Sequence, residues 1–414
     1  MKKSILFAGL MMVAAMFIGC DKDHSPETST SKLWPAATVS KNADGIEVEK
    51  WGYIDQKGNF VINAAYQDAN EFSCGLALVR VSASSLFFID EKNNMQSAPD
   101  FYSIQPYFYW NHVRYTTQSY LDGMLNKNFE IVIQPAYYSL GSMTGDGLIA
   151  FRQNRGDKVG FLDKDGEVAI SASYDYAQNF IDGAAVVEMG DSYGVINKKG
   201  EFTLSLQDKP LGNLGAERIG FADPDSRKYG MMDVNGKIVV QAIYDAYNSY
   251  GFTDSEYMAV CIDGKWGFID KNGKQILALQ YNYAFPFMDG KAWIQRAAGS
   301  AVELIDEKGK TLLTLAADEI PNGVFRQGLC LIEKVNATDG SVVMKYINEK
   351  GATVYQWTVP NANANGLYYG GGENGGEWGN EDYAPSAKRG DKFSKALERM
   401  MAPTEYGSRV QNVK

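Results

Sequence analysis

The segment Lys265-Trp-Gly-Phe-Ile-Asp-Lys-Asn-Gly-Lys274 decides the fold class of this protein. Within it, the strand-forming residues Phe268 and Ile269 precede Asp270-Lys-Asn-Gly273, and strand-forming residues resume at Ile276. An Asp at the first position of a turn accepts hydrogen bonds from the backbone that follows, and a Gly at the fourth position adopts positive φ at little cost. The segment therefore predicts a β-hairpin built on a type I turn with a G1 bulge.

The same pattern returns along the chain with a steady period. The Asp or Asn that opens the turn marks nine positions: Asp55, Asp90, Asn126, Asp163, Asn197, Asp233, Asp270, Asp306 and Asn348. Three residues after the marker, seven copies carry a Gly: Gly58, Gly166, Gly200, Gly236, Gly273, Gly309 and Gly351. Asn93, which also tolerates the left-handed conformation, takes this place in the second copy. Spacings of 34 to 42 residues over eight intervals predict a tandem repeat of about 36 residues.

A second glycine lies three residues before the marker in six copies: Gly52, Gly123, Gly160, Gly194, Gly230 and Gly267. Because a Gly inside a strand lowers β-propensity, its recurrence predicts that backbone or an aromatic ring approaches closely there. A third strand is expected at segments such as 75–80, and pairs such as Tyr174-Asp175 are expected to begin a short fourth strand.

The unit resembles the WG (or KWG) repeat of bacterial proteins. The resemblance rests on the pattern Gly-aromatic-Ile-Asp-x-x-Gly with Tyr-Asp behind it, over roughly residues 50–357, and two copies keep the Trp-Gly pair, at Trp51 and Trp266. The family generally lacks an assigned activity, so the resemblance supplies no catalytic residue. We expect the signature residues to be structural: Trp51, Gly52, Asp55, Gly58, Gly160, Asp163, Gly166, Gly230, Asp233, Gly236, Trp266, Gly267, Asp270 and Gly273.

These observations predict an all-β array of about nine repeats over residues 46–360. Units of this size must stack on one another to bury their apolar faces. A closed β-propeller-like ring would remove open sheet edges, and an open β-superhelix is the alternative.

The first 20 residues resemble the signal peptide of a bacterial lipoprotein. Two lysines precede an apolar stretch of 13 residues, Leu6 to Ile18, which is too short to span a bilayer core of roughly 30 Å as a helix. The stretch ends in Phe17-Ile-Gly-Cys20, similar to a lipobox. The resemblance implies cleavage after residue 19 and covalent lipid on Cys20, so that acyl chains anchor the protein. An ordinary signal peptide with an incidental Cys is the alternative.

Residues 20–45 are expected to form a flexible tether. The acidic start of this segment is similar to the export signals of Bacteroidota lipoproteins. We therefore expect lipid anchoring to the outer membrane in the cell envelope, with surface exposure as a hypothesis.

Composition argues against several classes of function. The net charge is −10 without a basic stripe, which disfavours nucleic acid as a partner. The only histidines are His24 and His112, and no P-loop or Rossmann fingerprint occurs, so no metal, no cofactor and no catalytic residue is expected. Cys261 and Cys330 lie in apolar strand-like contexts and are expected in the core, with a Cys74–Cys261 or Cys261–Cys330 bridge as the alternative.

The repeat pattern fails most clearly after the second marker. Residues 100–115 contain eight aromatic side chains, His112 included. One interpretation is a binding surface in which aromatic faces contact a sugar or a peptide and an arginine anchors it; its residues would be Tyr107, Tyr109, Trp110, His112 and Arg114. The other interpretation is a degenerate blade with alternate residues buried.

Residues 361–414 are expected to form a Gly/Asn-rich linker followed by a short helix, at 391–401, that docks on the array, with a free partner-binding tail as the alternative. Taken together, the sequence predicts a non-catalytic envelope lipoprotein whose repeat array binds or scaffolds a protein or glycan partner. The alternative is a carbohydrate-active hydrolase with an Asp/Glu pair in a central cleft.

Overall fold

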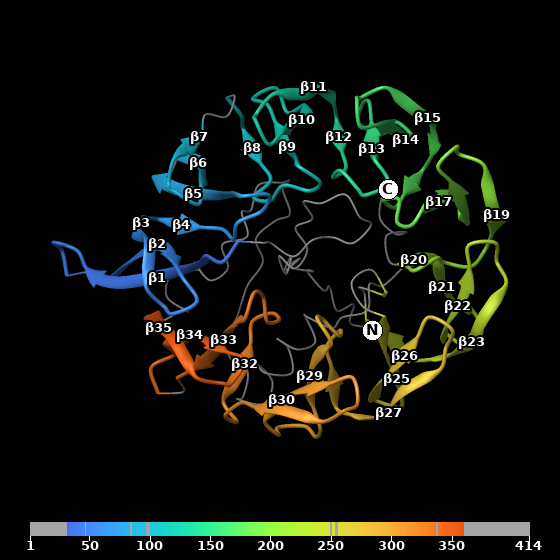
Figure 1. Ribbon diagram of the computed structural model, residues 1–414. Coiled ribbons are helices and arrows are strands. Elements are labelled where there is room, and N and C mark those ends of the chain that lie inside the picture. Colours follow the sequence, from blue (N-terminus) through green and yellow to red (C-terminus); the bar gives the residue numbers. More distant parts are fainter. Residues whose placement is uncertain are drawn as a thin grey trace, which may run out of the picture.

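The protein is a closed β-propeller of nine antiparallel sheets, or blades, in a computed structural model (Figure 1). The structure describes residues 31–45, 47–82, 85–96, 100–248, 251–252, 256–336 and 338–359. The ring is closed because β1 packs beside β35, so the open β-superhelix is not the fold. In the residues described, no helix is long and apolar enough to span a membrane.

Blade A has three strands, β1 (Trp34–Lys41), β2 (Glu47–Ile54) and β3 (Phe60–Tyr66). Blades B to E each have four: β4 (Asp68–Ala69), β5 (Leu76–Ser82), β6 (Ser85–Asp90) and β7 (Met95–Gln96); β8 (Ser103–Ile104), β9 (His112–Thr116), β10 (Asp122–Asn126) and β11 (Ile131–Tyr137); β12 (Ser139–Leu140), β13 (Leu148–Arg152), β14 (Val159–Asp163) and β15 (Val168–Tyr174); β16 (Tyr176–Ala177), β17 (Ala184–Met189), β18 (Ser192–Asn197) and β19 (Phe202–Gln207).

Blades F to I complete the ring with β20 (Leu211–Gly215), β21 (Arg218–Ala222), β22 (Tyr229–Asp233) and β23 (Ile238–Tyr244); β24 (Ala246–Tyr247), β25 (Tyr257–Ile262), β26 (Lys265–Asp270) and β27 (Gln275–Tyr281); β28 (Tyr283–Ala284), β29 (Lys291–Gln295), β30 (Val302–Asp306) and β31 (Thr311–Thr314); β32 (Glu319–Pro321), β33 (Leu329–Val335), β34 (Val342–Asn348) and β35 (Thr353–Val359).

The predicted turn joins the last two strands of each blade, and we call it the marker turn. In blade G, Asp270 Oδ1 accepts bonds from the backbone N–H groups of Asn272 and Lys274, both at 2.9 Å. Gly273 has φ +80°, as the bulge requires. The Tyr-Asp pair ends one blade rather than starting a strand: Tyr174 closes β15, and the inner strand of blade E begins after Asp175. The sequence unit therefore spans two blades.

The glycine before the marker lies where the last strand of the blade bends over the strand before it. A Cβ on Gly267 would stand 2.7 Å from the Leu277 carbonyl oxygen, and one on Gly52 would stand 2.3 Å from that of Ile62. The register shifts at the same point in both blades. The predicted close approach of backbone is thus confirmed, since no Cβ fits there.

The predicted C-terminal boundary of the tether, residues 20–45, is wrong. Residues 34–41 form β1, in which Trp34, Ala36 and Ala37 are buried, so the blade array begins before residue 46. The segment does not contain a marker turn. It also does not alternate between apolar and polar residues, because its first half packs on both faces. The leader at 1–19, Cys20, the first part of the tether and the expected helix within 361–414 lie outside the described residues.

Tyrosine side chains from blade I complete the edge of β1 at the point of closure. In blade B, the carbonyls of Leu78 and Arg80 accept bonds from the backbone of the inner strand segment. Leu78 and Arg80 pair with the strand that precedes the marker of blade B. In blade A, Pro35 and Ala37 pair with the same positions of the strand that precedes the marker, so they are the equivalent residues. Those carbonyls accept bonds instead from the hydroxyls of two residues of blade I, each at 2.9 Å: Tyr346 on Pro35 and Tyr355 on Ala37.

The apolar core is divided among the interfaces between neighbouring blades. Phe268 and Phe287, for example, pack with ring centroids 4.6 Å apart between blades G and H. Cys261 and Cys330 are buried and free, which confirms their place in the core and excludes both alternative bridges. Each blade is held by its neighbours, as expected of stacked repeats.

Candidate functional site: the loop face of the propeller

The loops from the inner to the second strand of each blade share one face of the ring with the marker turns, because antiparallel strands reverse at each connection. Gln56, in the marker turn of blade A, donates to the Gln327 carbonyl in the inner loop of blade I at 2.6 Å. Arg218 of blade F likewise donates to the Lys271 carbonyl in the marker turn of blade G at 2.7 Å. We call this surface, made of inner loops and marker turns, the loop face.

Six inner loops in the described chain end in the same two-residue turn. Its residues both have positive φ and lie between two paired residues; they are Cys74-Gly75, Trp110-Asn111, Asp182-Gly183, Ala216-Glu217, Asp289-Gly290 and Gln327-Gly328. This is the type I′ hairpin, whose twist matches that of the flanking strands. The backbone is therefore constant from blade to blade, while the first residue of the turn changes in size, charge and polarity.

Hydrogen bonds between neighbouring inner loops hold this face together. They run from Phe108 N to Ser73 Oγ (2.9 Å), Gln105 Nε2 to Ser142 Oγ (3.2 Å), Gly183 N to Asp146 Oδ1 (3.1 Å), Ala216 N to Asp182 Oδ2 (2.6 Å) and Phe252 N to Leu214 O (2.5 Å). A set of loops bonded in this way presents its side chains in fixed positions, which lowers the entropy lost on binding.

The aromatic segment predicted as a site forms the inner loop and second strand of blade C, and the structure divides it. Phe108 and Tyr115 are buried in the core, at 0% and 2% exposure. Tyr107, Tyr109 and Trp110 lie in the inner loop and are half-buried. The loop therefore contributes to both the core and the loop face, in line with parts of each interpretation.

Trp110 occupies the tip of the turn with φ +47° and is followed by Asn111 at φ +61°. Bulky side chains rarely adopt this conformation, and four of the other five such turns have Gly second. The indole packs against Gly145 of blade D, where a Cβ would stand 3.0 Å from the ring. The Nδ1–H of His112 donates to the Trp110 carbonyl at 2.6 Å, since a carbonyl can only accept. Burial lowers the pKa of His112, so the imidazole is neutral at neutral pH.

Arg114 is bonded to a neighbouring blade, and Tyr107 is affected by burial and by a nearby charge. Arg114 Nη1 donates to the Leu140 carbonyl at 2.5 Å and lies 4.0 Å from Asp122, so it joins blade C to blade D. Burial raises the pKa of Tyr107, and the negative charge of Glu71 raises it further. All five predicted site residues are therefore half-buried, and Tyr109 and Trp110 also pack against the core cluster between blades C and D.

A charged pair that sequence reasoning missed lies beside the ring closure. Arg326 Nη2 of blade I is 3.2 Å from Glu71 Oε1 of blade B, so the pair reaches across blade A. The guanidinium also lies over the Trp34 ring, 5.9 Å from its centroid. Burial raises the pKa of Glu71, and Arg326 opposes that rise. No periodic signal links the two residues, because they belong to different positions in a closed ring.

The inner turns themselves were also missed, although x-Gly dipeptides before the second strand, such as Asp182-Gly183, are a local signal for them. Over the described ranges, no group of three or more His, Cys, Asp or Glu side chains is placed to hold a metal ion. The predicted lipidation site, Cys20, lies outside those ranges.

Comparison with known proteins supports the repeat and the fold. The model of the "WG containing repeat" family matches residues 51–82, 123–155, 160–192, 229–266 and 266–296. No curated protein sequence matches the chain. A crystal structure of a eukaryotic initiation factor is similar over 79% of this chain and 97% of its own, at 11% identity and a TM-score of 0.54. Dihydro-heme d1 dehydrogenase NirN is similar over 69% of this chain and 74% of its own, at 12% identity and a TM-score of 0.42. At 11% identity, the likeness to the initiation factor concerns the fold alone.

Proposed function

Because the chain belongs to the WG-repeat family and folds as a nine-bladed β-propeller, we propose that it is a non-catalytic binding or scaffolding protein of the cell envelope. Its partner is a protein or a glycan, held on the loop face. The observation that carries this proposal is the constant type I′ backbone, whose first turn residue is of five kinds among the six described loops. A rigid scaffold with variable loops is the usual arrangement of a binding surface.

The contact site that we propose on this face is the inner loop of blade C. Tyr109 and Trp110 offer aromatic faces that suit a sugar ring or an apolar side chain. His112, kept neutral by burial, has Nδ1 bonded to the Trp110 carbonyl, which leaves Nε2 as the acceptor. Arg114 then positions the loop through its bond to blade D.

We also propose that the protein is anchored through lipid on Cys20, in the outer membrane. The lipobox-like Phe17-Ile-Gly-Cys20 and the polar segment after it support this placement. The net charge of −10 argues against nucleic acid as a partner. The proposed action needs no cofactor.

The test is capture of a partner by the mature protein, in detergent, from envelope protein extracts and on glycan arrays. The variant is Tyr109→Ala with Trp110→Ala. The matched control is Tyr102→Ala with Tyr120→Ala, which removes an exposed aromatic pair of the same blade, 47% and 64% exposed, that lies outside the inner loop.

We expect the first variant to lose a retained partner and the control to keep it. Retention of no partner by the parent protein, or equal loss in both variants, would contradict the proposal. Release of reducing ends from envelope polysaccharides by the parent protein would instead favour the hydrolase alternative.

A further inference from the structure

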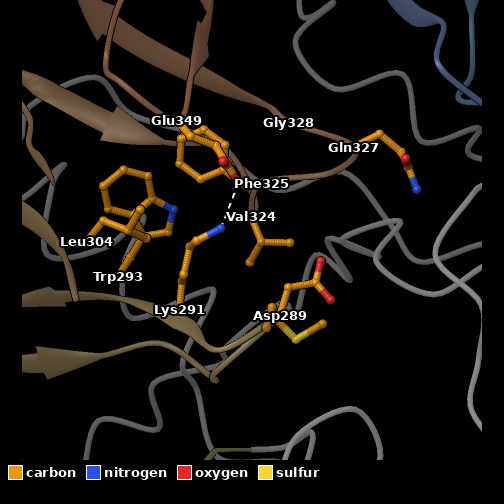
Figure 2. Close-up of a pocket in the computed structure, with 10 residues that line it drawn as sticks. Asp289, Lys291, Trp293, Leu304, Val324, Phe325, Gln327, Gly328 and Glu349 are labelled. Carbon is orange, nitrogen blue, oxygen red and sulfur yellow. Dashed lines mark hydrogen bonds and ion pairs between the residues drawn. The ribbon is translucent and has the colours of Figure 1, made fainter. Parts of the chain in front are cut away.

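A pocket of about 210 Å³ opens on the loop face between blades H and I (Figure 2). Asp289 lines it from the inner turn of blade H, and Gln327 lines it from the equivalent turn of blade I. Lys291 of β29 and Glu349 of the blade I marker turn complete its polar wall. We call it the junction pocket.

At two other junctions between blades, an Asp carboxylate of one inner loop accepts a backbone N–H of the next inner loop. The junction pocket lies at a junction where the described residues do not make this bond. Between blades D and E, the Asp146 carboxylate accepts the backbone N–H of Gly183 at 3.1 Å. Between blades E and F, the Asp182 carboxylate accepts that of Ala216 at 2.6 Å. Asp182 and Asp289 hold the same tip position, with φ of +51° and +47°.

Asp289 behaves differently from these two residues. It is exposed, and among the described residues no hydrogen bond or ion pair is made by its side chain. Its carboxylate lines the pocket instead of bonding to the next turn. The repeat thus supplies the geometry of a structural contact at this junction. Because that bond is not made among the described residues, the acceptor is available for a ligand.

The charges around the junction pocket favour a cation. Lys291 Nζ is already paired with Glu349 Oε1 at 2.6 Å, so these two charges offset each other. Asp289 adds a carboxylate that has no hydrogen-bond or ion-pair partner among the described residues, and Glu307 Oε1 lies 3.6 Å from where a side chain on Gly290 would begin. Two carboxylates are therefore uncompensated locally, on a chain whose net charge is −10. Such a site attracts and orients positive groups.

The remaining lining is apolar and suits an alkyl stem. Trp293 and Phe325 stack at the base with centroids 5.9 Å apart and an angle of 23°, and they hold the wall rigid. Figure 2 shows the Val324 side chain between the tip of Lys291 and the carboxylate of Asp289. A long side chain with a terminal charge can lie along such a wall while its head meets the carboxylate.

From this geometry we propose that the junction pocket binds a lysine or arginine side chain of a protein partner, with the cationic head on Asp289. This inference rests on the proposed binding function and names the chemistry of one contact. It favours a protein over a glycan, because a neutral sugar would leave the carboxylate uncompensated.

The probe is N-acetyl-arginine methylamide, titrated into the mature protein in detergent and followed by NMR or calorimetry. N-acetyl-citrulline methylamide, its neutral isostere, and a panel of neutral methyl glycosides are the comparison ligands. The variant is Asp289→Asn, and the matched control is Asp182→Asn, which changes the same turn position in a junction that is already bonded.

We expect millimolar binding of the arginine derivative, weaker at high salt, and about tenfold weaker binding by Asp289→Asn. Asp289→Asn should unfold like the parent, because the Asp289 side chain is exposed and makes no hydrogen bond or ion pair with the described residues. Asp182→Asn should bind like the parent and unfold more easily.

Equal binding of the citrulline derivative, affinity unchanged by Asp289→Asn, or preference for a glycoside would overturn the inference. Partner capture that persists through any of these results would leave the proposed function standing. Arginine binding without capture of any partner would do the reverse, supporting the pocket and contradicting the function.

Discussion

The closure of the ring makes a quantitative prediction about a single hydroxyl group. Tyr346 is 3% exposed, and its hydroxyl donates to the Pro35 carbonyl at 2.9 Å, across 311 residues of sequence. Tyr346→Phe removes the hydroxyl and keeps the ring. The Pro35 carbonyl, itself buried, then loses this donor.

A buried acceptor left without its partner costs about 1–3 kcal/mol. Because β1 is the edge that this bond completes, we expect the cost to appear first as local opening of β1. Amide hydrogen exchange of residues 36–39 should then become about 5- to 160-fold faster, as the same energy implies. Urea unfolding of the whole protein should show a smaller loss of stability.

Tyr53→Phe is the matched control, since Tyr53 occupies the equivalent position in blade A and its hydroxyl donates to the Asn70 carbonyl at 2.6 Å. That bond joins blades A and B within one stretch of chain, so its loss does not touch the closure. Exchange in β1 should change by no more than the global stability does. Unchanged exchange in Tyr346→Phe, or equal exposure of β1 in both variants, would refute the reasoning.

Three further predictions concern the repeat, the response to acid and the anchor. Gly267→Ala should destabilise the protein by about 1–3 kcal/mol in urea unfolding, because a Cβ would stand 2.7 Å from the Leu277 carbonyl; Gly264→Ala, with open space around it, should cost about 1 kcal/mol through its positive φ alone. Bonds from Lys158 and the Gly190 backbone lower the pKa of Asp175, so its contribution to stability is present above its ordinary pKa of 3.8 and is lost as pH falls through the lowered value; Asp175→Asn should flatten the acid limb of the stability curve. Cys20→Ser should move the protein from the membrane fraction to the soluble fraction and abolish fatty-acid labelling, and membrane retention of the variant would argue against lipid anchoring.

The repeat was predictable because its information is local. Asp270 and Gly273 fix one turn, and Gly267 fixes one close approach of strands, within ten residues of each other. A period that recurs nine times then identifies the blade without any tertiary contact. The same logic fails for β1, whose residues Trp34 to Ala37 are buried on both faces and carry no marker.

The candidate sites were likewise predictable only where their information is local. Residues 100–115 stood out because their composition breaks the pattern, but the sequence did not separate Phe108, which packs in the core, from Trp110, which lies at a turn tip. Alternation predicts burial only for regular strands, and this segment includes a two-residue turn. Asp289 shows most clearly what local sequence cannot predict. Asp289 and Asp182 are both followed by Gly, so the sequence does not distinguish the two turns.

By itself, then, the sequence determined the blade: a four-residue turn, two glycines and a spacing, all of which act over distances shorter than one repeat. The tertiary structure decided that nine such blades close, because closure depends on contacts such as that between Tyr346 and Pro35, which no local pattern encodes. It also decided which junctions are bonded and which is open. Asp182 bonds to the next turn and Asp289 lines a pocket, because the outcome depends on which groups of the neighbouring blade stand beside each carboxylate.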